Sequence, residues 1–253
     1  MKLEGIAAIV TGGASGLGAA TTEMLAGNGA KVTIFDLNEA IGKAQAAKVG
    51  GLFLQVDVTD EESVAAAIVT AAAAHGVARV LVNCAGVAPA IKTVGKENRP
   101  HPLDAFRKAV EINLIGSFNV LSQFAAALCA ADSVGEERGV IVNTASVAAF
   151  DGQIGQAAYA ASKAGVAGMT LPIARDLAQH RIRVVTIAPG IFLTPMLMGL
   201  PQAAQDSLGT QVPHPSRLGR PEEYAQLVES IVFNPMLNGE VIRLDGAIRM
   251  APR

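Results

Sequence analysis

A tyrosine and a lysine, Tyr159 and Lys163, lie four residues apart in a stretch made mostly of small residues, and the chain has only 2 tyrosines. Four residues advance an α-helix by about 400°, so both side chains would share one face with Cβ atoms about 5–6 Å apart. A free tyrosine, with a pKa near ~10, is a poor base at neutral pH, but a nearby ammonium favours the phenolate. The spacing therefore indicates a proton-transfer centre, although a short pattern also fits a packed tyrosine and a solvated lysine.

Ser146 favours the chemical interpretation over the packing one. It lies just after an apolar run, 139–143, that reads as a strand, so its hydroxyl would lie at one edge of a sheet. From there it can hydrogen-bond a carbonyl or alcohol oxygen of a substrate. Together, the three side chains predict proton transfer beside a hydride acceptor.

A glycine-rich turn, 11–18 (TGGASGLG), follows the first predicted strand and opens the first predicted helix. Glycines let the backbone turn tightly and approach a pyrophosphate, whose charge meets the N-terminus of the helix. The spacing is GxxxGxG rather than GxGxxG, and a strand–helix connection without a ligand remains the alternative. The cofactor contacts predicted in this turn are Gly12, Ser15, Gly16, Leu17 and Gly18.

Asp36 ends the second predicted strand, and neither Leu37 nor Asn38 after it is cationic. An acidic side chain at this position can accept hydrogen bonds from both hydroxyls of an adenosine ribose and would repel a 2′-phosphate. The sequence therefore predicts NAD rather than NADP as the cofactor. The alternative is an ordinary turn residue at the end of a strand.

The third and fourth predicted strands also end in candidate cofactor contacts. Open α/β sheets bind ligands at the carboxyl ends of their strands. Asp57 could contact the adenine, and the stretch 83–86 (NCAG) could pass under the cofactor. Cys84 is interpreted as a buried small residue rather than a nucleophile. The contacts predicted here are Asp57, Val58, Asn83, Ala85 and Gly86.

The elements that must position these residues alternate regularly along the chain. Near-continuous apolar runs are typical of parallel strands that are covered on both faces, and helical patterns lie between them. This alternation predicts an α/β fold, a single-domain Rossmann-type doubly wound parallel sheet with helices on both faces, over residues 1–253. The predicted strands are 6–10, 31–36, 52–58, 79–83, 139–143, 183–187 and 240–244, and the predicted helices are 16–28, 40–49, 61–75, 103–131, 156–180 and 221–233.

Two segments fit none of these elements. Segment 87–102 is a polar insertion that carries Lys92, Lys96, Arg99 and His101, and segment 191–216 holds four prolines among apolar residues. Long loops in a compact domain are usually lids or binding loops, so 191–216 is predicted to be a substrate lid. The cations of the insertion could meet phosphates of a substrate, or they could belong to a solvated loop.

Composition narrows the class of protein. The chain of 253 residues is 51% hydrophobic with a mean hydropathy of +0.37, so we expect elements buried on both faces or a large subunit interface. A net charge of −2 gives no reason to expect nucleic acid as a partner. Two cysteines without CxxC spacing read as buried thiols of a reducing compartment and not as a metal site. With no signal-like segment and no uninterrupted apolar run of membrane-spanning length, we expect a cytoplasmic protein without membrane contact.

The order of these motifs resembles that of the short-chain dehydrogenases/reductases over essentially the whole chain. The shared features are TGxxxGxG, NxAG, Ser146, YxxxK and the pair Pro189-Gly190. The resemblance implies a catalytic tetrad of Asn113, Ser146, Tyr159 and Lys163, in which Asn113 holds a water that links Lys163 to solvent. It also implies cofactor contacts from Tyr159, Lys163, Pro189, Gly190, Phe192 and Thr194.

Several segments, including 143–165, 169–178 and 238–250, resemble a subgroup of this family, the type II 3-hydroxyacyl-CoA dehydrogenases. The resemblance implies an NAD-dependent homotetramer that interconverts (S)-3-hydroxyacyl-CoA and 3-ketoacyl-CoA. Asp151 stands where glutamate is expected, and Leu193 stands where a small residue is expected. The substrate contacts implied are Ser146, Gln153, Gln156, Phe192 and Leu193.

Two other functions are compatible with the same residues. The first is an NAD(H)-dependent dehydrogenase or reductase of small ketones, β-ketoesters or hydroxysteroids, which needs identical chemistry and a different pocket. The second is a nucleotide-binding scaffold without turnover, since a fold does not by itself imply catalysis. Retention of both Tyr159 and Lys163 favours an enzyme.

Overall fold

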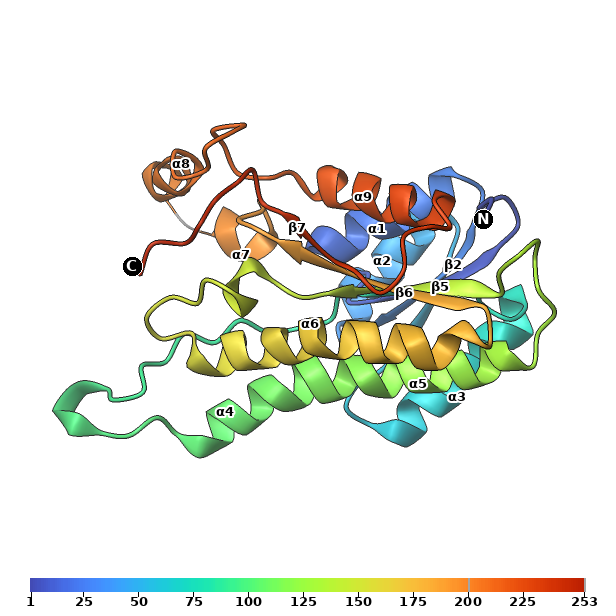
Figure 1. Ribbon diagram of the computed structural model, residues 1–253, viewed down its shortest axis with the longest axis horizontal. Helices are drawn as coiled ribbons and strands as arrows, with labels where there is room; N and C mark the ends of the chain where they lie inside the picture. Colours follow the sequence, from blue (N-terminus) through green and yellow to red (C-terminus); the bar gives the residue numbers. More distant parts are fainter. Residues whose placement is uncertain (200, 253) are drawn as a thin grey trace.

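Seven parallel strands form one sheet at the centre of the computed structural model, which describes residues 1–199 and 201–252 (Figure 1). The strand order is β3-β2-β1-β4-β5-β6-β7. Successive strands are therefore added toward one edge of the sheet up to β3 and toward the other edge from β4 onward. This order confirms the predicted doubly wound fold. The strands are β1 (Ala7–Thr11), β2 (Lys31–Asp36), β3 (Leu52–Gln55), β4 (Val80–Asn83), β5 (Gly139–Thr144), β6 (Ile182–Pro189) and β7 (Val241–Leu244).

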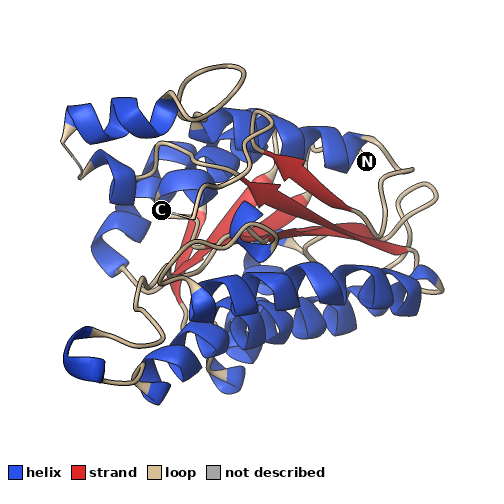
Figure 2. Cartoon of the chain, turned by 60° about the vertical axis from the view of Figure 1, so that its left-hand side comes forward, coloured by secondary structure: helices blue, strands red, loops and turns tan. Residues whose placement is uncertain are grey.

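Helices cover both faces of the sheet, which explains why the central strands are apolar on both sides (Figure 2). One face packs on α3 (Glu61–His75), α5 (Gly116–Cys129) and α6 (Ala157–Ala178) through residues such as Leu81 and Ile141. The other packs on α1 (Gly16–Gly27) and α9 (Pro221–Phe233) through residues such as Val82 and Val142. The remaining α-helices are α2 (Glu39–Val49), α4 (Leu103–Val110), α7 (Pro195–Met198) and α8 (Gln202–Gly209).

The predicted helix 103–131 is one helical stretch with a wider turn inside it. A π-helical turn, η2 (Glu111–Ile115), joins α4 to α5. The buried Asn113 lies in this turn, and its side chain bonds to the backbone of Val87 in both directions. Because π turns are often found at functional sites, the irregularity indicates the importance of Asn113.

One predicted strand end was wrong, and the two segments left without an element contain short ones. β3 ends at Gln55 rather than at residue 58, because its pairing with β2 stops where Asp36 leaves the sheet. The predicted lid, 191–216, is not a plain loop but contains α7 and α8. The insertion 87–102 contains a 3-10 turn, η1 (Lys96–Asn98), and an isolated bridge between Val94 and Pro100.

Candidate active site

A cavity of about 1090 Å³ opens at the carboxyl ends of the strands. Parallel pairing places the ends of β1, β4, β5 and β6 at one edge of the sheet, so side chains far apart in sequence meet there. Most of the residues predicted for the site line this cavity. They are Gly12, Ser15, Gly16, Leu17, Gly18, Asp36, Asp57, Val58, Ala85, Gly86, Ser146, Gln153, Gln156, Tyr159, Lys163, Pro189, Gly190, Phe192 and Thr194.

The cavity has two sides that follow the strand order. The cofactor side is formed by the turns after β1 to β4, and it includes Gly12, Asp36 and Ala85. The substrate side is formed by segments after β5, β6 and β7, and it includes Gln153 and Met250. The proton-transfer residues lie between the two sides, because Ser146 follows β5 near the middle of the sheet.

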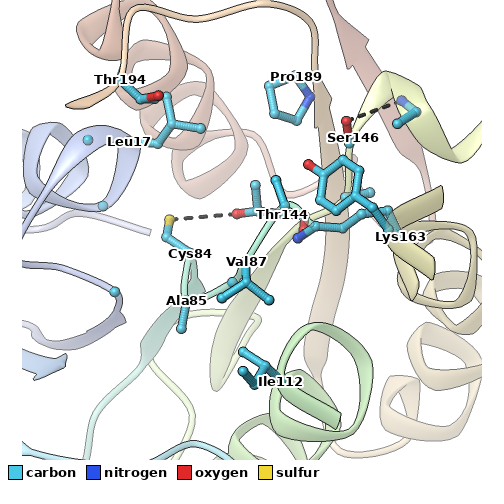
Figure 3. Close-up of a pocket in the computed structure, with 18 of the residues that line it drawn as sticks. Leu17, Cys84, Ala85, Val87, Ile112, Thr144, Ser146, Lys163, Pro189 and Thr194 are labelled. Atoms are coloured by element: carbon cyan, nitrogen blue, oxygen red, sulfur yellow. Dashed lines mark hydrogen bonds between the residues drawn. The ribbon is translucent and has the colours of Figure 1, made fainter. Parts of the chain in front are cut away.

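Tyr159 and Lys163 lie one turn apart on α6 and line the cavity together. The ammonium of Lys163 is buried and donates a hydrogen bond to the carbonyl oxygen of Thr144 at 2.7 Å. Ser146 begins the 3-10 turn η3 (Val147–Ala149), and its Oγ accepts a hydrogen bond from the Ala148 amide at 3.1 Å. Figure 3 shows Ser146 and Lys163 entering the same space from different elements. The grouping predicted from the sequence is therefore present.

Burial is the main cause of the pKa shifts of Tyr159 and Lys163. Burial raises the pKa of Tyr159, and a hydrogen bond with the Ser146 side chain lowers it in part. Burial lowers the pKa of Lys163 to about 8. The sequence led us to expect that Lys163 lowers the tyrosine pKa; in this geometry burial dominates, and Lys163 bonds to the Thr144 backbone instead. Tyr159 is thus held as a neutral phenol, and a positive charge brought close to it would favour loss of its proton.

Asn113 lies outside the wall that the described residues form around the cavity. Its side-chain amide donates to the Ser162 hydroxyl at 2.9 Å, and that hydroxyl donates to the Tyr159 carbonyl oxygen at 2.8 Å. Through Val87 and Ser162, Asn113 connects the chain after β4 to the helix that carries Tyr159. The structure thus gives Asn113 a positioning geometry, while the water predicted at this residue stays a prediction.

The cofactor side has the shape that a pyrophosphate needs. At Gly12, with φ of +62°, an added Cβ would lie 2.7 Å from the Ala85 nitrogen, and at Gly18 an added Cβ would lie 2.1 Å from the Gly12 oxygen. Ser15 precedes α1 without a side-chain cap, so the first amides of this helix are not satisfied by that hydroxyl. A compact glycine turn at an open helix N-terminus fits the phosphates of a dinucleotide.

Asp36 is held in a fixed orientation on the same side. Its Oδ1 accepts from the Asn38 amide at 3.0 Å, and its Oδ2 accepts from the Ala14 amide at 3.2 Å. The carboxylate is therefore anchored beside the glycine turn while it lines the cavity. Asp57 is similarly fixed, because it accepts hydrogen bonds from the amide and the hydroxyl of Thr59. Both acidic side chains fit contacts to an adenosine.

Asn83 lies beneath the cofactor side rather than on the cavity wall of the described residues. It is buried, accepts a hydrogen bond from the Thr11 hydroxyl at 3.3 Å and donates one to Asn143 at 3.0 Å. The Thr11 hydroxyl also accepts from the Ala85 amide at 3.2 Å. Asn83 therefore supports the ends of β1, β4 and β5 instead of lining the cavity.

The substrate side differs most from the prediction. Gln153 and Gln156 line it and bond to each other, but Leu193 lies off the described wall, and its amide is bonded to Gly219. Leu193, an implied substrate contact, therefore does not line the cavity of the described residues. Other residues line the cavity as well. Ile191, Leu197 and Leu208 come from the predicted lid, 191–216, whereas Met250 had not been singled out.

A buried hydroxyl pair behind the site was also missed. Tyr224, from α9, lies 2.7 Å from the Thr144 hydroxyl, and Cys84 lies within sulfur hydrogen-bond distance of both. Burial raises the pKa of the Cys84 thiol, which disfavours a thiolate nucleophile, as expected. As whole residues, Cys84 and Cys129 are half-buried, although the Cys84 thiol is shielded enough for burial to raise its pKa.

The polar insertion lies beside the cavity without contributing its cations to the main wall. Lys92 lines a smaller adjoining cavity of about 360 Å³, which also touches Gln153 and Gln156. Arg99 pairs with Glu97 at 2.7 Å on the surface. Among the described residues no cluster of three or more histidine, cysteine or acidic side chains is arranged to hold a metal ion.

Comparison with known proteins gives matches over the whole chain. The family model described as short chain dehydrogenase matches residues 6–205. The protein "3-hydroxyacyl-CoA dehydrogenase type-2" of Rattus norvegicus is 54% identical, over 99% of this chain and 98% of its own length. The protein of the same name from Drosophila melanogaster is 54% identical, over 96% of this chain and 97% of its own. The crystal structure of 3-hydroxyacyl-CoA dehydrogenase type-2 from Mycobacterium avium superposes with a TM-score of 0.95 at 43% identity, covering 98% of both chains.

Proposed function

The chain belongs to the short chain dehydrogenase family and is an oxidoreductase dependent on a nicotinamide dinucleotide, and we propose that it interconverts (S)-3-hydroxyacyl-CoA and 3-ketoacyl-CoA. The full-length identity of 54% to two proteins named for this activity supports the substrate class. One geometric observation carries the reaction type. Ser146, Tyr159 and Lys163 line one cavity, between the glycine turn that fits a dinucleotide and the substrate side.

In the proposed mechanism, Ser146 donates a hydrogen bond to the substrate oxygen, and Tyr159, once its own proton has passed to solvent, removes the proton of the substrate hydroxyl as a phenolate. A nicotinamide held on the cofactor side of the cavity, beside Tyr159 and Lys163, would supply the acceptor for the hydride of the carbinol carbon. Lys163 keeps a positive charge one helical turn from the phenol, which favours the phenolate once the proton has left. In the reverse direction, Tyr159 returns the proton to the oxygen of the 3-keto group.

The proposal is tested with purified protein, NADH and acetoacetyl-CoA, followed at the absorbance of NADH. We expect turnover that Tyr159→Phe abolishes. An aryl ketone and a β-ketoester with NADH, and a hydroxysteroid with NAD⁺, are assayed in parallel, because the second candidate function uses the same catalytic centre with a different pocket. Turnover of these compounds without any turnover of acetoacetyl-CoA would overturn the acyl-CoA assignment.

We propose NAD rather than NADP as the cofactor, and Asp36 supports this choice. Its anchored carboxylate lies where a ribose is expected, and a 2′-phosphate there would meet a like charge. The comparison of kcat/KM for the two cofactors tests this choice. A wild-type preference for NADPH would refute it.

We also propose a homotetramer, supported by an apolar helix on the surface. The stretch Leu103–Cys129 is the one helix among the described residues that is long and apolar enough to cross a membrane, contrary to the expectation from sequence. Its inner residues Val120, Leu121 and Phe124 belong to the core, while Ile115 and Phe118 are exposed. A second copy of this chain would cover these exposed side chains. Light scattering after size exclusion gives the mass that tests this assembly.

The expected cytoplasmic location stays a proposal. Two free cysteines in the described chain are consistent with a reducing compartment. Fractionation of cells that produce the protein, followed by detection with an antibody, tests this location. Recovery with a membrane or a secreted fraction would contradict it.

A further inference from the structure

One wall on the substrate side comes from a segment in which the sequence predicted no site residue. Segment 245–252 follows β7, and its Met250 is half-buried and lines the same cavity as Ser146 and Tyr159. In Figure 1 this segment runs from β7 past α7 toward the loop that leads into α6. A methionine side chain is unbranched and adapts to irregular apolar surfaces. Met250 is therefore suited to contact the carbon chain of a substrate.

Segment 245–252 joins the two other parts of the substrate side. The side chain of Gln153 donates to the Ala251 oxygen at 2.9 Å, and the Ile154 amide donates to the Pro252 oxygen at 3.0 Å. At its other end, the Gly246 oxygen accepts a hydrogen bond from the His214 amide of the lid at 3.2 Å. The position of Met250 is therefore set by bonds to both the lid and the loop before α6.

Arg243, at the end of β7, holds this segment through charged contacts. Its Nη2 lies 2.6 Å from an Asp151 oxygen, and its Nε lies 2.7 Å from an Asp245 oxygen. The same Nη2 donates to the Ile248 oxygen at 3.0 Å, and the guanidinium lies 5.4 Å from the centre of the Phe150 ring. Charge-assisted bonds of this kind fix geometry more strongly than neutral ones. Arg243 thus ties the segment to the loop that begins with Phe150.

We propose that Met250 is a specificity-determining residue that limits the bulk of the substrate chain, and that Arg243 is a positioning residue that sets Met250 in place. The choice of acyl-CoA substrates for its test rests on the proposed function. Met250 lines the cavity on the same side as Gln153 and Leu208, away from the glycine turn, so a longer carbon chain would meet it.

The test compares kcat/KM for 3-ketodecanoyl-CoA and acetoacetyl-CoA. Met250→Ala should raise the long-to-short ratio about tenfold and Met250→Phe should lower it by a similar factor, because pocket volume discriminates chain length on this scale. Met250→Leu conserves volume and serves as the matched control, with a ratio within about twofold of wild type. Ratios within twofold of wild type for both Ala and Phe would refute the role of Met250.

A second substrate series separates this inference from the proposed function. Propan-2-ol and octan-2-ol differ in chain length without a CoA group. If the wild type oxidises these alcohols and not the acyl-CoA substrates, the proposed function fails, and the ratio between the alcohols decides the role of Met250. A ratio shift in the predicted directions supports the inference in either series.

Arg243→Met tests the positioning role. The variant should change the long-to-short ratio, and Met250→Ala combined with it should show no further change beyond Met250→Ala alone. Arg249→Met is the matched control, because Arg249 is exposed and shares only Asp245 and the Ile248 oxygen with Arg243. An equal loss of kcat/KM for both chain lengths in Arg243→Met would show a purely structural role and overturn the assignment.

Discussion

The two sides of the cavity are built in different ways. The cofactor side consists of short turns that directly follow β1, β2 and β4, and its shape depends on backbone geometry and anchored side chains such as Asp36. The substrate side brings together Gln153, Leu208 and Met250 from three separate segments. A cofactor whose phosphates and ribose do not change needs a fixed local site, whereas the substrate chain is bounded by side chains from separate segments. The comparison teaches that cofactor binding and substrate choice lie on different parts of the same sheet edge.

The largest expected effect concerns Tyr159, one of the proton-transfer residues that lie between the two sides of the cavity. Tyr159→Phe removes the hydroxyl that transfers the proton and should lower kcat by on the order of 10³-fold or more. Binding of NADH, measured by fluorescence titration, should change little because the cofactor side is untouched. If Tyr159→Phe retained a tenth of the wild-type kcat, the proposed proton transfer would be wrong.

Lys163, which also lies between the two sides, should make the stability of the fold depend on pH. The folded pKa of Lys163 is about 8, below the ordinary 10.5, so above pH 8 the unfolded chain binds more protons at this group than the folded one. Stability should therefore rise with pH in this window, by roughly 2 kcal/mol between pH 7 and pH 9.5. The rise is measured as the free energy of unfolding in urea at both pH values.

Lys163→Met should remove this rise, while Lys96→Met, on the exposed insertion, should keep it. Burial also raises the pKa of Cys84 from 9.0 and of Tyr159 from 10.0, so these groups oppose the rise above about pH 9 and pH 10, where the folded state binds their additional protons. The contribution of Lys163 is therefore the difference between wild type and Lys163→Met. An equal pH slope in wild type and Lys163→Met would contradict the buried, partly uncharged lysine.

A change on the cofactor side should act on cofactor choice alone. Asp36→Ala removes the hydrogen-bond acceptor and the negative charge, and should reduce the preference for NAD over NADP about tenfold or more. Glu39→Ala, three residues farther along and exposed, is the matched control and should keep the preference. A changed long-to-short ratio of kcat/KM in Asp36→Ala would contradict the separation of cofactor choice from substrate choice.

These differences also explain what the sequence could predict. Sequence spacing identified the residues that lie beside a strand end or within one helical turn of a partner. They are the turn after β1, Asp36, Ser146 and the pair on α6. Met250 had no such signal, since its place depends on how Arg243 folds the chain after β7 toward Asp151. Local spacing therefore predicts the fold and the cofactor side well, but it does not predict contacts made through tertiary packing.

Asn113 and Leu193 show the limits of carrying a residue over from a resemblance. Asn113 is central, yet its side chain is bonded to Val87 and Ser162 rather than turned into the cavity. The π turn that holds it could not be read from apolar spacing, because such a turn changes the helix by a single residue. Position in a motif therefore predicts that a residue matters, while its contacts decide how.

The smallest expected effect belongs to Leu193, which the resemblance placed in the pocket and the structure places off its wall. Its amide bonds to Gly219, and its neighbour Phe192 is the buried residue that lines the cavity. Leu193→Ala should therefore leave the long-to-short ratio of kcat/KM within about twofold of wild type, since it changes no wall of the described cavity. A large shift would mean that the lid turns Leu193 inward when substrate binds, and the substrate side would then be shaped by movement of the lid as well as by Met250.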